Sequence, residues 1–207
     1  MANNLIPRYT ASERRNHWIV AITFVLAALG GLALFHPSFF WLTGLFGSGT
    51  WTRILHPFIG VVMAIFFAGL YFRFRRDNKL APADREWLQH FGEMLRNREP
   101  QIDTGKYNAG QKYIFKLQAL TVLLLLLSGI VMWQPYFAPA FSVTWLRIAA
   151  VVHAFSAFLL ILGIIVHVYA AIWVRGSMRA MTRGTVTRAW AKQHHPAWYR
   201  EVAKTAK

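Results

Sequence analysis

The sequence predicts an all-α integral membrane protein, a four-helix bundle, and three observations predict it. Hydrophobic residues make up 56% of the 207 residues and charged residues only 15%, proportions typical of membrane proteins. Four apolar stretches, at approximately residues 18–35, 54–72, 113–133 and 146–174, approach the ~20 residues needed to span hydrocarbon. Tryptophans such as Trp18, Trp133 and Trp173 stand near the ends of these stretches, as expected of aromatic belts at the two membrane surfaces.

The first span, residues 18–35, follows a short basic lead-in where Ser12 is a candidate helix cap. Proline explains why this span ends at His36-Pro37. The span is too long for a cleavable signal peptide and lacks a convincing cleavage site. A glycine-rich connection leads to the second span, which we expect to begin around Trp51, so that Pro57 falls in the first turn, where proline is tolerated.

About forty residues separate the second and third spans. Apolar residues recur there at helical spacing, which predicts a short amphipathic helix lying on the membrane surface; they are Trp87, Leu88, Phe91, Met94 and Leu95. The polar stretch 103–112 comes next, at a membrane boundary, and is either a helix-start turn or part of a binding site. After the fourth span a basic, aromatic tail is expected along the interface. No internal repeat is evident, so residues 1–207 are interpreted as one membrane domain.

The charge distribution predicts the orientation. An even number of spans places both termini and the middle loop on one side, and that side holds all 23 Lys and Arg residues except Arg53 and Arg147. The positive-inside rule makes this side cytoplasmic. The net charge of +15 could suggest nucleic acid, but basic residues concentrated at span ends favour anionic lipid headgroups as counterions. We therefore expect membrane lipid, and no nucleic acid, as a partner.

Four histidines lie inside or at the ends of the spans, where ionisable groups are rare and usually functional. His153 and His167 are fourteen residues apart in the fourth span, roughly 21 Å along one helix face. His56 opens the second span at the depth of His153, and His17 opens the first at the depth of His167. Neutral imidazoles suit haem iron, and no cysteine is present to hold a cluster or a covalent haem. The pattern predicts two b haems, held by His56/His153 and His17/His167.

Roles other than haem binding remain possible for several of these residues. Any single histidine could be a polar packing residue or a member of a proton relay. Gly60 and Gly163, one turn from His56 and His167, could clear space for a macrocycle or simply permit close helix packing. Structural roles are expected for His36, His90, His194 and His195, the last two in an aqueous tail before Pro196. Zinc fits poorly, because there is no cysteine and no H-E-x-x-H spacing.

Six segments, in order and nearly end to end, resemble the gamma, cytochrome b556, subunit of membrane-bound respiratory formate dehydrogenases. They are Arg14–Trp18 (RRNHW), Arg53–Phe58 (RILHPF), Gly105–Lys112 (GKYNAGQK), Pro135–Ala138 (PYFA), Trp173–Ser177 (WVRGS) and Trp190–Arg200 (WAKQHHPAWYR). The resemblance implies a subunit of the bacterial inner membrane with two haem b groups. By position, His56 and His153 match the ligands of the outer haem, and His17 and His167 those of the inner haem.

The resemblance also implies partners and a substrate. Asn108 and Gly110 match residues that contact the headgroup of a quinone, menaquinone or ubiquinone, near the cytoplasmic haem. A periplasmic alpha subunit containing molybdenum or tungsten would oxidise formate, and an iron–sulfur beta subunit would relay electrons. This chain would carry them inward and reduce quinone, and none of its residues would act on formate.

Two other functions remain compatible with the histidines and the bundle. One is a dihaem cytochrome b of another respiratory complex, such as a hydrogenase or thiosulfate reductase, which neighbouring genes would distinguish. The other is a haem-free membrane protein that uses histidines as a proton relay, which would lack a b-type absorbance band after reduction with dithionite.

Overall fold

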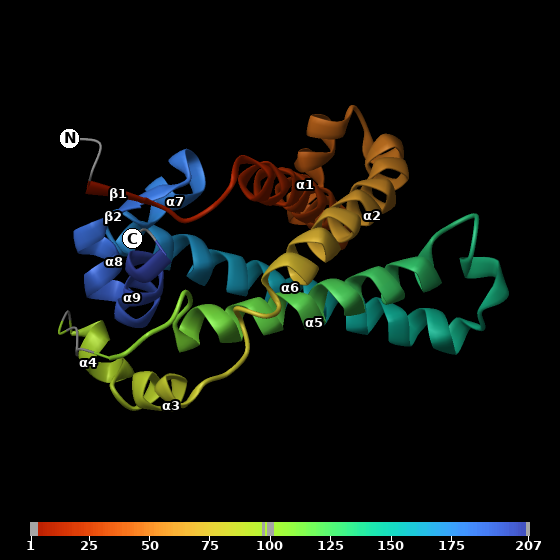
Figure 1. Cartoon of the computed structure of the whole chain (residues 1–207). Helices are drawn as coiled ribbons and strands as arrows, with labels where there is room; N and C mark the ends of the chain where they lie inside the picture. Colours follow the sequence, from red (N-terminus) through yellow and green to blue (C-terminus); the bar gives the residue numbers. More distant parts are fainter. Residues whose placement is uncertain (1–3, 97, 99–101, 206–207) are drawn as a thin grey trace. The chain divides into compact units, whose positions relative to one another are not determined.

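Four long helices dominate the computed structural model, which describes residues 4–96, 98 and 102–205 (Figure 1). They are α1 (Ala11–Phe35), α2 (Gly49–Phe74), α5 (Ala109–Met132) and α6 (Val143–Trp173). Each has 24 to 31 residues and an apolar stretch long enough to cross a membrane. The all-α, four-span prediction is confirmed, although each helix begins earlier than its apolar stretch.

Helix α1 begins earlier than expected because Thr10, not Ser12, caps it. The Thr10 hydroxyl accepts a hydrogen bond from the Glu13 N–H at 3.2 Å, and the Glu13 carboxylate accepts one from the Thr10 N–H at 2.7 Å. This reciprocal pair is a capping box. Ser12 lies inside the first turn, where its hydroxyl accepts a hydrogen bond from Arg73.

Helix α2 also starts early, which changes the position of its proline. Ser48 precedes the helix, and its hydroxyl accepts a hydrogen bond from the Trp51 N–H at 3.2 Å. With Gly49 as the first residue, Pro57 lies in the helix interior, so its predicted place in the first turn was wrong. Proline has no N–H to donate to the carbonyl of Arg53, which bends or weakens a helix locally.

The expected amphipathic helix is present as two pieces, α3 (Pro82–Gln89) and α4 (Phe91–Leu95). His90 separates them. Its backbone N–H contacts the Glu86 carbonyl at 3.2 Å, and its ring Nδ1 contacts the same oxygen at 3.0 Å. A side chain that competes for a backbone carbonyl in this way favours a helix end.

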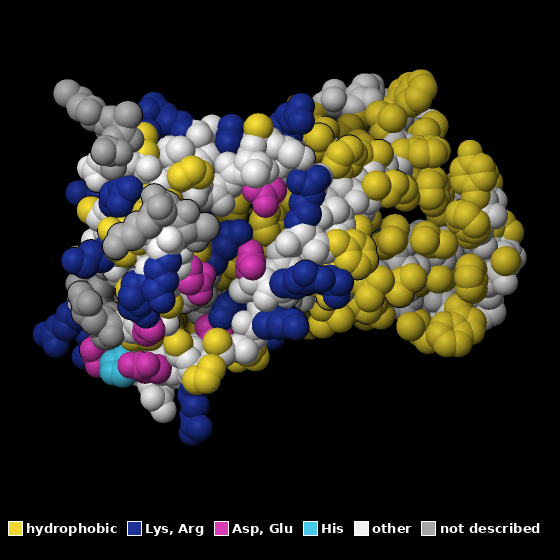
Figure 2. Space-filling view, viewed as in Figure 1, with side chains coloured by type: hydrophobic (Ala, Val, Ile, Leu, Met, Phe, Trp, Pro, Cys, Tyr) yellow, Lys and Arg dark blue, Asp and Glu magenta, His cyan; other side chains and the backbone are white. Residues whose placement is uncertain are grey.

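The described residues group into two compact units. The apolar unit comprises Arg15–Tyr71 and Leu117–Ile165, and the basic unit comprises Met1–Arg14, Phe72–Lys116 and Val166–Lys207. Figure 2 shows one face of the molecule, where hydrophobic side chains gather over the apolar unit and Lys, Arg, Asp and Glu gather over the basic unit. Only Arg15, Arg53 and Arg147 among the Lys and Arg residues belong to the apolar unit.

The apolar unit has a core formed by its long helices. Met63, Ala64 and Phe67 of α2 pack with Val122 of α5 and Leu160 of α6. Many of its other large hydrophobic side chains face outward. Their exposure suits a protein whose solvent is lipid, because a water-soluble surface rarely carries so large an apolar area.

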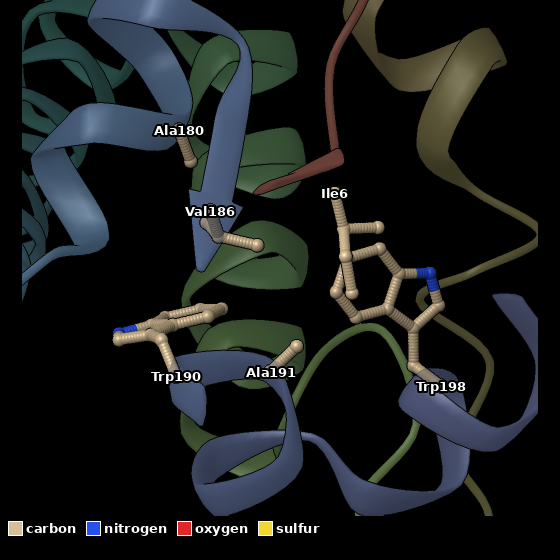
Figure 3. Packing of buried hydrophobic residues seen from close by; sticks show 6 residues of the cluster. All are labelled: Ile6, Ala180, Val186, Trp190, Ala191 and Trp198. Atoms are coloured by element: carbon tan, nitrogen blue, oxygen red, sulfur yellow. The ribbon is translucent and has the colours of Figure 1, made fainter. Parts of the chain in front are cut away.

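The basic unit is held together by segments from distant parts of the chain. Strand β1 (Leu5–Pro7) pairs antiparallel with β2 (Thr185–Thr187). Three short helices complete the tail: α7 (Ser177–Arg183), α8 (Arg188–His194) and α9 (Pro196–Thr205). Figure 3 shows their buried cluster, which consists of Ile6, Ala180, Val186, Trp190, Ala191 and Trp198. The tail is therefore a folded part of this unit together with the N-terminal strand.

Gly184 lies between α7 and β2, at a position where the backbone conformation and the close neighbours favour glycine. Its φ of +79° is a left-handed conformation that glycine adopts without strain. A Cβ at this position would lie 2.7 Å from the carbonyl oxygen of Tyr9. The Gly184 carbonyl accepts hydrogen bonds from the Arg8 and Tyr9 N–H groups at 2.8 and 3.1 Å.

Candidate haem and quinone sites

His56 and His153 face one another inside the apolar unit. His56 comes from α2 and His153 from α6, and their ring centroids are 6.2 Å apart with ring planes at 66°. The predicted matching of depth between the start of the second span and the start of the fourth is therefore present in the structure. Helices α2 and α6 thus each contribute one imidazole to the same part of the apolar unit.

Glycines on the neighbouring helices border both rings. A Cβ added to Gly31 of α1 would lie 3.3 Å from His56 Cε1, and one added to Gly30 would lie 3.4 Å from its Nδ1. On the other side of the pair, a Cβ at Gly129 of α5 would lie 3.4 Å from His153 Cε1. The absence of side chains at these positions lets each imidazole lie directly against a helix backbone.

The Nδ1 atoms of the two rings have different surroundings. His153 Nδ1 lies 3.0 Å from the hydroxyl oxygen of Ser128. His56 Nδ1 is buried and has no hydrogen-bond partner among the described residues.

The other predicted pair is divided between the two units. His17 lies in α1 within the apolar unit, with its ring in edge contact with Trp18, 5.5 Å between centroids. His167 lies in the part of α6 that belongs to the basic unit, and its side chain is exposed. The pairing of His17 with His167 stays a prediction.

Asn108 caps α5 in the basic unit. Its side-chain Oδ1 accepts a hydrogen bond from the Gln111 N–H at 2.9 Å, and the Gln111 side chain accepts one from the Asn108 N–H at 3.0 Å. The interpretation of this polar stretch as a helix-start turn is therefore correct for Asn108 and Gln111. The cap uses the oxygen of the Asn108 amide and not its NH₂ group, which can act as a donor.

Gly110, the other predicted quinone contact, has an aromatic ring packed against its backbone. A Cβ at Gly110 would lie 2.9 Å from Cη2 of Trp87 in α3. Two residues further on, the Lys112 ammonium pairs with both oxygens of the Asp84 carboxylate at 3.0 and 2.8 Å, and both side chains are buried. The sequence did not single out this pair, which joins α3 to the first turn of α5.

Comparison with known proteins adds an independent observation. Residues 8–184 match the family described as prokaryotic cytochrome b561. The chain belongs to this family. The cytochrome b556(fdo) subunit of formate dehydrogenase from Escherichia coli (strain K12) is 50% identical over 200 residues, which cover 97% of this chain and 94% of the relative.

Two further relatives carry similar names. The cytochrome b556(Fdn) subunit of the nitrate-inducible formate dehydrogenase of the same strain is 40% identical over 203 residues, 98% of this chain and 94% of the relative. The formate dehydrogenase cytochrome b556 subunit of Haemophilus influenzae (strain ATCC 51907 / DSM 11121 / KW20 / Rd) is 42% identical over 197 residues, 95% of this chain and 83% of the relative. The resemblance noted in the sequence is confirmed.

Membership of the cytochrome b561 family identifies this chain as an integral membrane cytochrome b, whose cofactor is haem b. The His56/His153 pair fits that cofactor. Metal–imidazole bonds are about 2 Å long, so two imidazoles on opposite sides of one iron atom have centroids roughly 6 Å apart. The observed 6.2 Å agrees with this geometry.

Of the two glycines highlighted in the sequence, Gly60 behaves differently from Gly163. A Cβ at Gly60 would meet no atom within 4 Å, whereas one at Gly163 would contact Leu117 at 3.5 Å. Close helix packing therefore accounts for Gly163 and not for Gly60. In this cytochrome b561 family member, Gly60 leaves space beside α2 one turn after His56.

Sequence reasoning missed the residues that border the histidine pair, namely Gly30, Gly31, Ser128 and Gly129. A signal for them existed. Gly30-Gly31 lies near the end of the first span and Ser128-Gly129 near the end of the third. Both dipeptides are therefore at the depth of His56 and His153, and small residues on other helices at that depth are candidates to border a ligand.

The prediction of an aqueous position for His195 was wrong, because its side chain is only 2% exposed. Its Nδ1 donates to the Gly105 carbonyl at 2.8 Å, and its Nε2 lies 3.3 Å from Arg8 Nη2. Burial, and then the charge of Arg8, lowers the pKa of His195 to about 3, so the ring is neutral at pH 7. The rings of Trp190 and Trp198 enclose the Arg8 guanidinium at 5.0 and 4.6 Å.

The remaining histidines have local structural contacts. His36 precedes the 3₁₀ helix η2 (Pro37–Phe46), and its ring accepts a hydrogen bond from the Ser38 N–H at 3.2 Å. His194 packs on the ring of Trp190, 5.2 Å between centroids. Among the described residues, no group of three or more His, Cys, Asp or Glu side chains could hold a metal ion by itself.

Proposed function

We propose that this chain is the electron-transferring, quinone-reducing membrane subunit of a bacterial respiratory formate dehydrogenase. Relatives at 40–50% identity over nearly the whole chain are named as cytochrome b556 subunits of that enzyme. We extend to this chain their complex, with an iron–sulfur beta subunit and an alpha subunit that oxidises formate at molybdenum or tungsten. The whole chain, residues 1–207, is taken as one dihaem membrane domain.

The observation that carries the proposal is the His56/His153 pair. Two half-buried imidazoles from different helices, with ring centroids 6.2 Å apart and bordered by glycines, would be able to hold one haem iron between them. His17 and His167 are proposed as the second pair. Bound haem supplies one-electron redox chemistry, and the contribution of the chain is to hold each iron at a fixed membrane depth between neutral imidazoles.

The distribution of charge supports an orientation. The basic unit contains both chain ends and the loop between α2 and α5, so we place it at the cytoplasmic surface of the inner membrane. His56 and His153 then lie toward the periplasm, where the iron–sulfur subunit would deliver electrons. The Lys and Arg side chains of the basic unit would meet anionic lipid headgroups.

Quinone is assigned to the start of α5, at the cytoplasmic side. The Asn108 NH₂ group can donate to a quinone carbonyl while its oxygen caps the helix. Gly110, the second residue of the helix, lies against the ring of Trp87 and is proposed as the second quinone contact. Reduction of each quinone to quinol would take two electrons, the redox chemistry that bound haem would supply, and two protons from cytoplasmic water.

The direct experiment is His153→Ala in the complete complex. We expect one haem per chain to be lost and formate-to-quinone turnover to stop, while formate oxidation with an artificial dye continues. His90→Ala is the matched control, because His90 is a histidine of the loop between α2 and α5 whose ring contacts a backbone carbonyl. Unchanged haem content in His153→Ala would contradict the proposal.

A further inference from the structure

Ser128 of α5 is placed to control the protonation pattern of His153. Its side chain is buried, with 5% exposure, and its hydroxyl oxygen lies 3.0 Å from His153 Nδ1. The same hydroxyl lies 2.6 Å from the Leu124 carbonyl one turn earlier in α5. It also lies 3.3 Å from the Leu125 carbonyl. The hydroxyl therefore touches three groups, two of which are only acceptors.

Counting hydrogens gives the direction of each bond. A serine hydroxyl has one hydrogen to donate, and a carbonyl can only accept. The hydroxyl donates this hydrogen to the Leu124 carbonyl, so it can offer only a lone pair of its oxygen to His153. The N–H at this contact must then belong to His153, on Nδ1. In a neutral imidazole the other nitrogen, Nε2, is then unprotonated and free to bind a metal.

The neighbouring residue fixes the ring in the same orientation. A Cβ at Gly129 would lie 3.4 Å from Cε1 and 3.7 Å from Nδ1 of His153. The Nδ1–Cε1 edge of the imidazole thus lies against the Ser128-Gly129 dipeptide of α5. A Cβ at position 129 would be in van der Waals contact with this edge, so the backbone of the dipeptide borders the ring closely.

We propose that Ser128 is a positioning residue that holds His153 as the Nδ1–H tautomer and raises the electron donation of Nε2 to the haem iron. This inference rests on the proposed function, in which His153 is an axial ligand. A hydrogen bond accepted from the outer ring N–H makes an imidazole ligand more basic. A more basic ligand favours the oxidised iron, so loss of the Ser128 hydroxyl raises the reduction potential of that haem.

The test compares nearly isosteric variants in the purified complex. Ser128→Thr keeps a hydroxyl and Ser128→Val does not, while both add the same bulk. Thr121→Val is the control, because Thr121 is a buried residue two turns earlier in α5 whose hydroxyl bonds to the Leu117 carbonyl of its own helix. The readouts are a potentiometric titration of the b haems and the electron paramagnetic resonance spectrum of the oxidised haems.

We expect Ser128→Val to raise the reduced-to-oxidised ratio of one haem at its wild-type midpoint by up to about tenfold, equivalent to about 59 mV for a one-electron couple. Its low-spin resonance should shift as well. Ser128→Thr should stay near the wild type, and Thr121→Val should change neither readout. Loss of the haem in Ser128→Val but not in Ser128→Thr would also support the role of the hydroxyl.

Identical behaviour of Ser128→Val and Ser128→Thr, or an equal shift in Thr121→Val, would overturn the inference. This failure is distinguishable from failure of the proposed function. If wild-type protein lacked haem, or if His153→Ala kept both haems, His153 would not be a ligand at all. If the wild type carried two haems and His153→Ala lost one, only the role of Ser128 would remain in question.

Discussion

An imidazole inside a membrane binds iron only if it is neutral and keeps one ring nitrogen free. His56 and His153, the proposed ligands, are bordered by small residues on adjacent helices. Gly30 and Gly31 border the first ring, and Gly129 borders the second. These glycines act as packing surfaces, because an imidazole that rests on a helix backbone has little freedom to turn.

A substitution at Gly31 should therefore disturb one haem site selectively. Valine at position 31 would place atoms against His56 Cε1, where even a Cβ would be only 3.3 Å away. Overpacking of this kind costs about 1–3 kcal/mol, so we expect Gly31→Val to lower the occupancy of one of two haems. Haem extraction and the reduced-minus-oxidised spectrum measure it.

Gly44→Val is the control for this experiment, since a Cβ at Gly44 would meet no atom within 4 Å. Equal haem content in Gly31→Val and Gly44→Val would show that the contact at Gly31 does not position His56.

His195 should make the stability of the protein depend on pH. Its pKa is about 3 in the folded chain, against an ordinary value of 6.5, so the unfolded chain binds more protons between these values. Stability is then complete above about pH 6.5 and falls as the pH decreases, by at most about 1.4 kcal/mol per pH unit. Thermal unfolding in detergent at pH 7.5, 6 and 5 measures this loss.

His195→Gln removes the titrating group while keeping a polar side chain. We expect its midpoint temperature to fall less between pH 7.5 and 5 than that of the wild type, whatever its absolute stability. A parallel decline of both proteins would mean that His195 is protonated as easily in the folded chain as in the unfolded one.

At the scale of helices, hydropathy predicted the four spans and capping chemistry decided where they begin. The helices start at Ala11 and Gly49 because Thr10 and Ser48 satisfy free N–H groups before the apolar stretches begin. Periodicity of apolar residues does not report such polar caps. For the same reason the interior position of Pro57 could not be inferred from the apolar pattern alone.

Asn108, at the beginning of α5, has a structural role as a helix cap and a proposed functional role as a quinone contact. Asn108→Asp separates them, because the carboxylate can still cap the helix but has no NH₂ group. We expect both haems to remain and quinone turnover to fall roughly fivefold, the effect of losing a hydrogen bond of about 1 kcal/mol. Formate-driven quinol production measures the change.

The control for this site is Gln111→Glu, which alters the other half of the same capping pair. Normal quinol production in Asn108→Asp would remove Asn108 from the quinone site. An equal decrease in both variants would attribute the effect to the helix start rather than to quinone.

At the scale of the whole molecule, the sequence predicted that His56 and His153 lie close together but did not predict the basic unit. Each β-strand has three residues, and about 180 residues separate Ile6 from its partner Val186, so no local pattern reports their pairing. The burial of His195 depends on that same long-range assembly. Its neighbours Arg8 and Gly105 come from two other segments of the chain.

The proposed path of the electrons across the membrane has an energetic consequence. Electrons that move from the periplasmic to the cytoplasmic side travel against an inside-negative potential. Each charge moved costs about 2.3 kcal/mol per 100 mV, so the reaction would store redox energy as membrane potential. The proposed path uses two haems, one near each surface, and their number is the central claim.

Haem stoichiometry tests that claim most directly. A reduced-minus-oxidised spectrum combined with quantitative haem extraction should give two b haems per chain in the wild type and one each in His153→Ala and His167→Ala. A colourless protein, or a single haem in fully loaded wild-type material, would contradict the account.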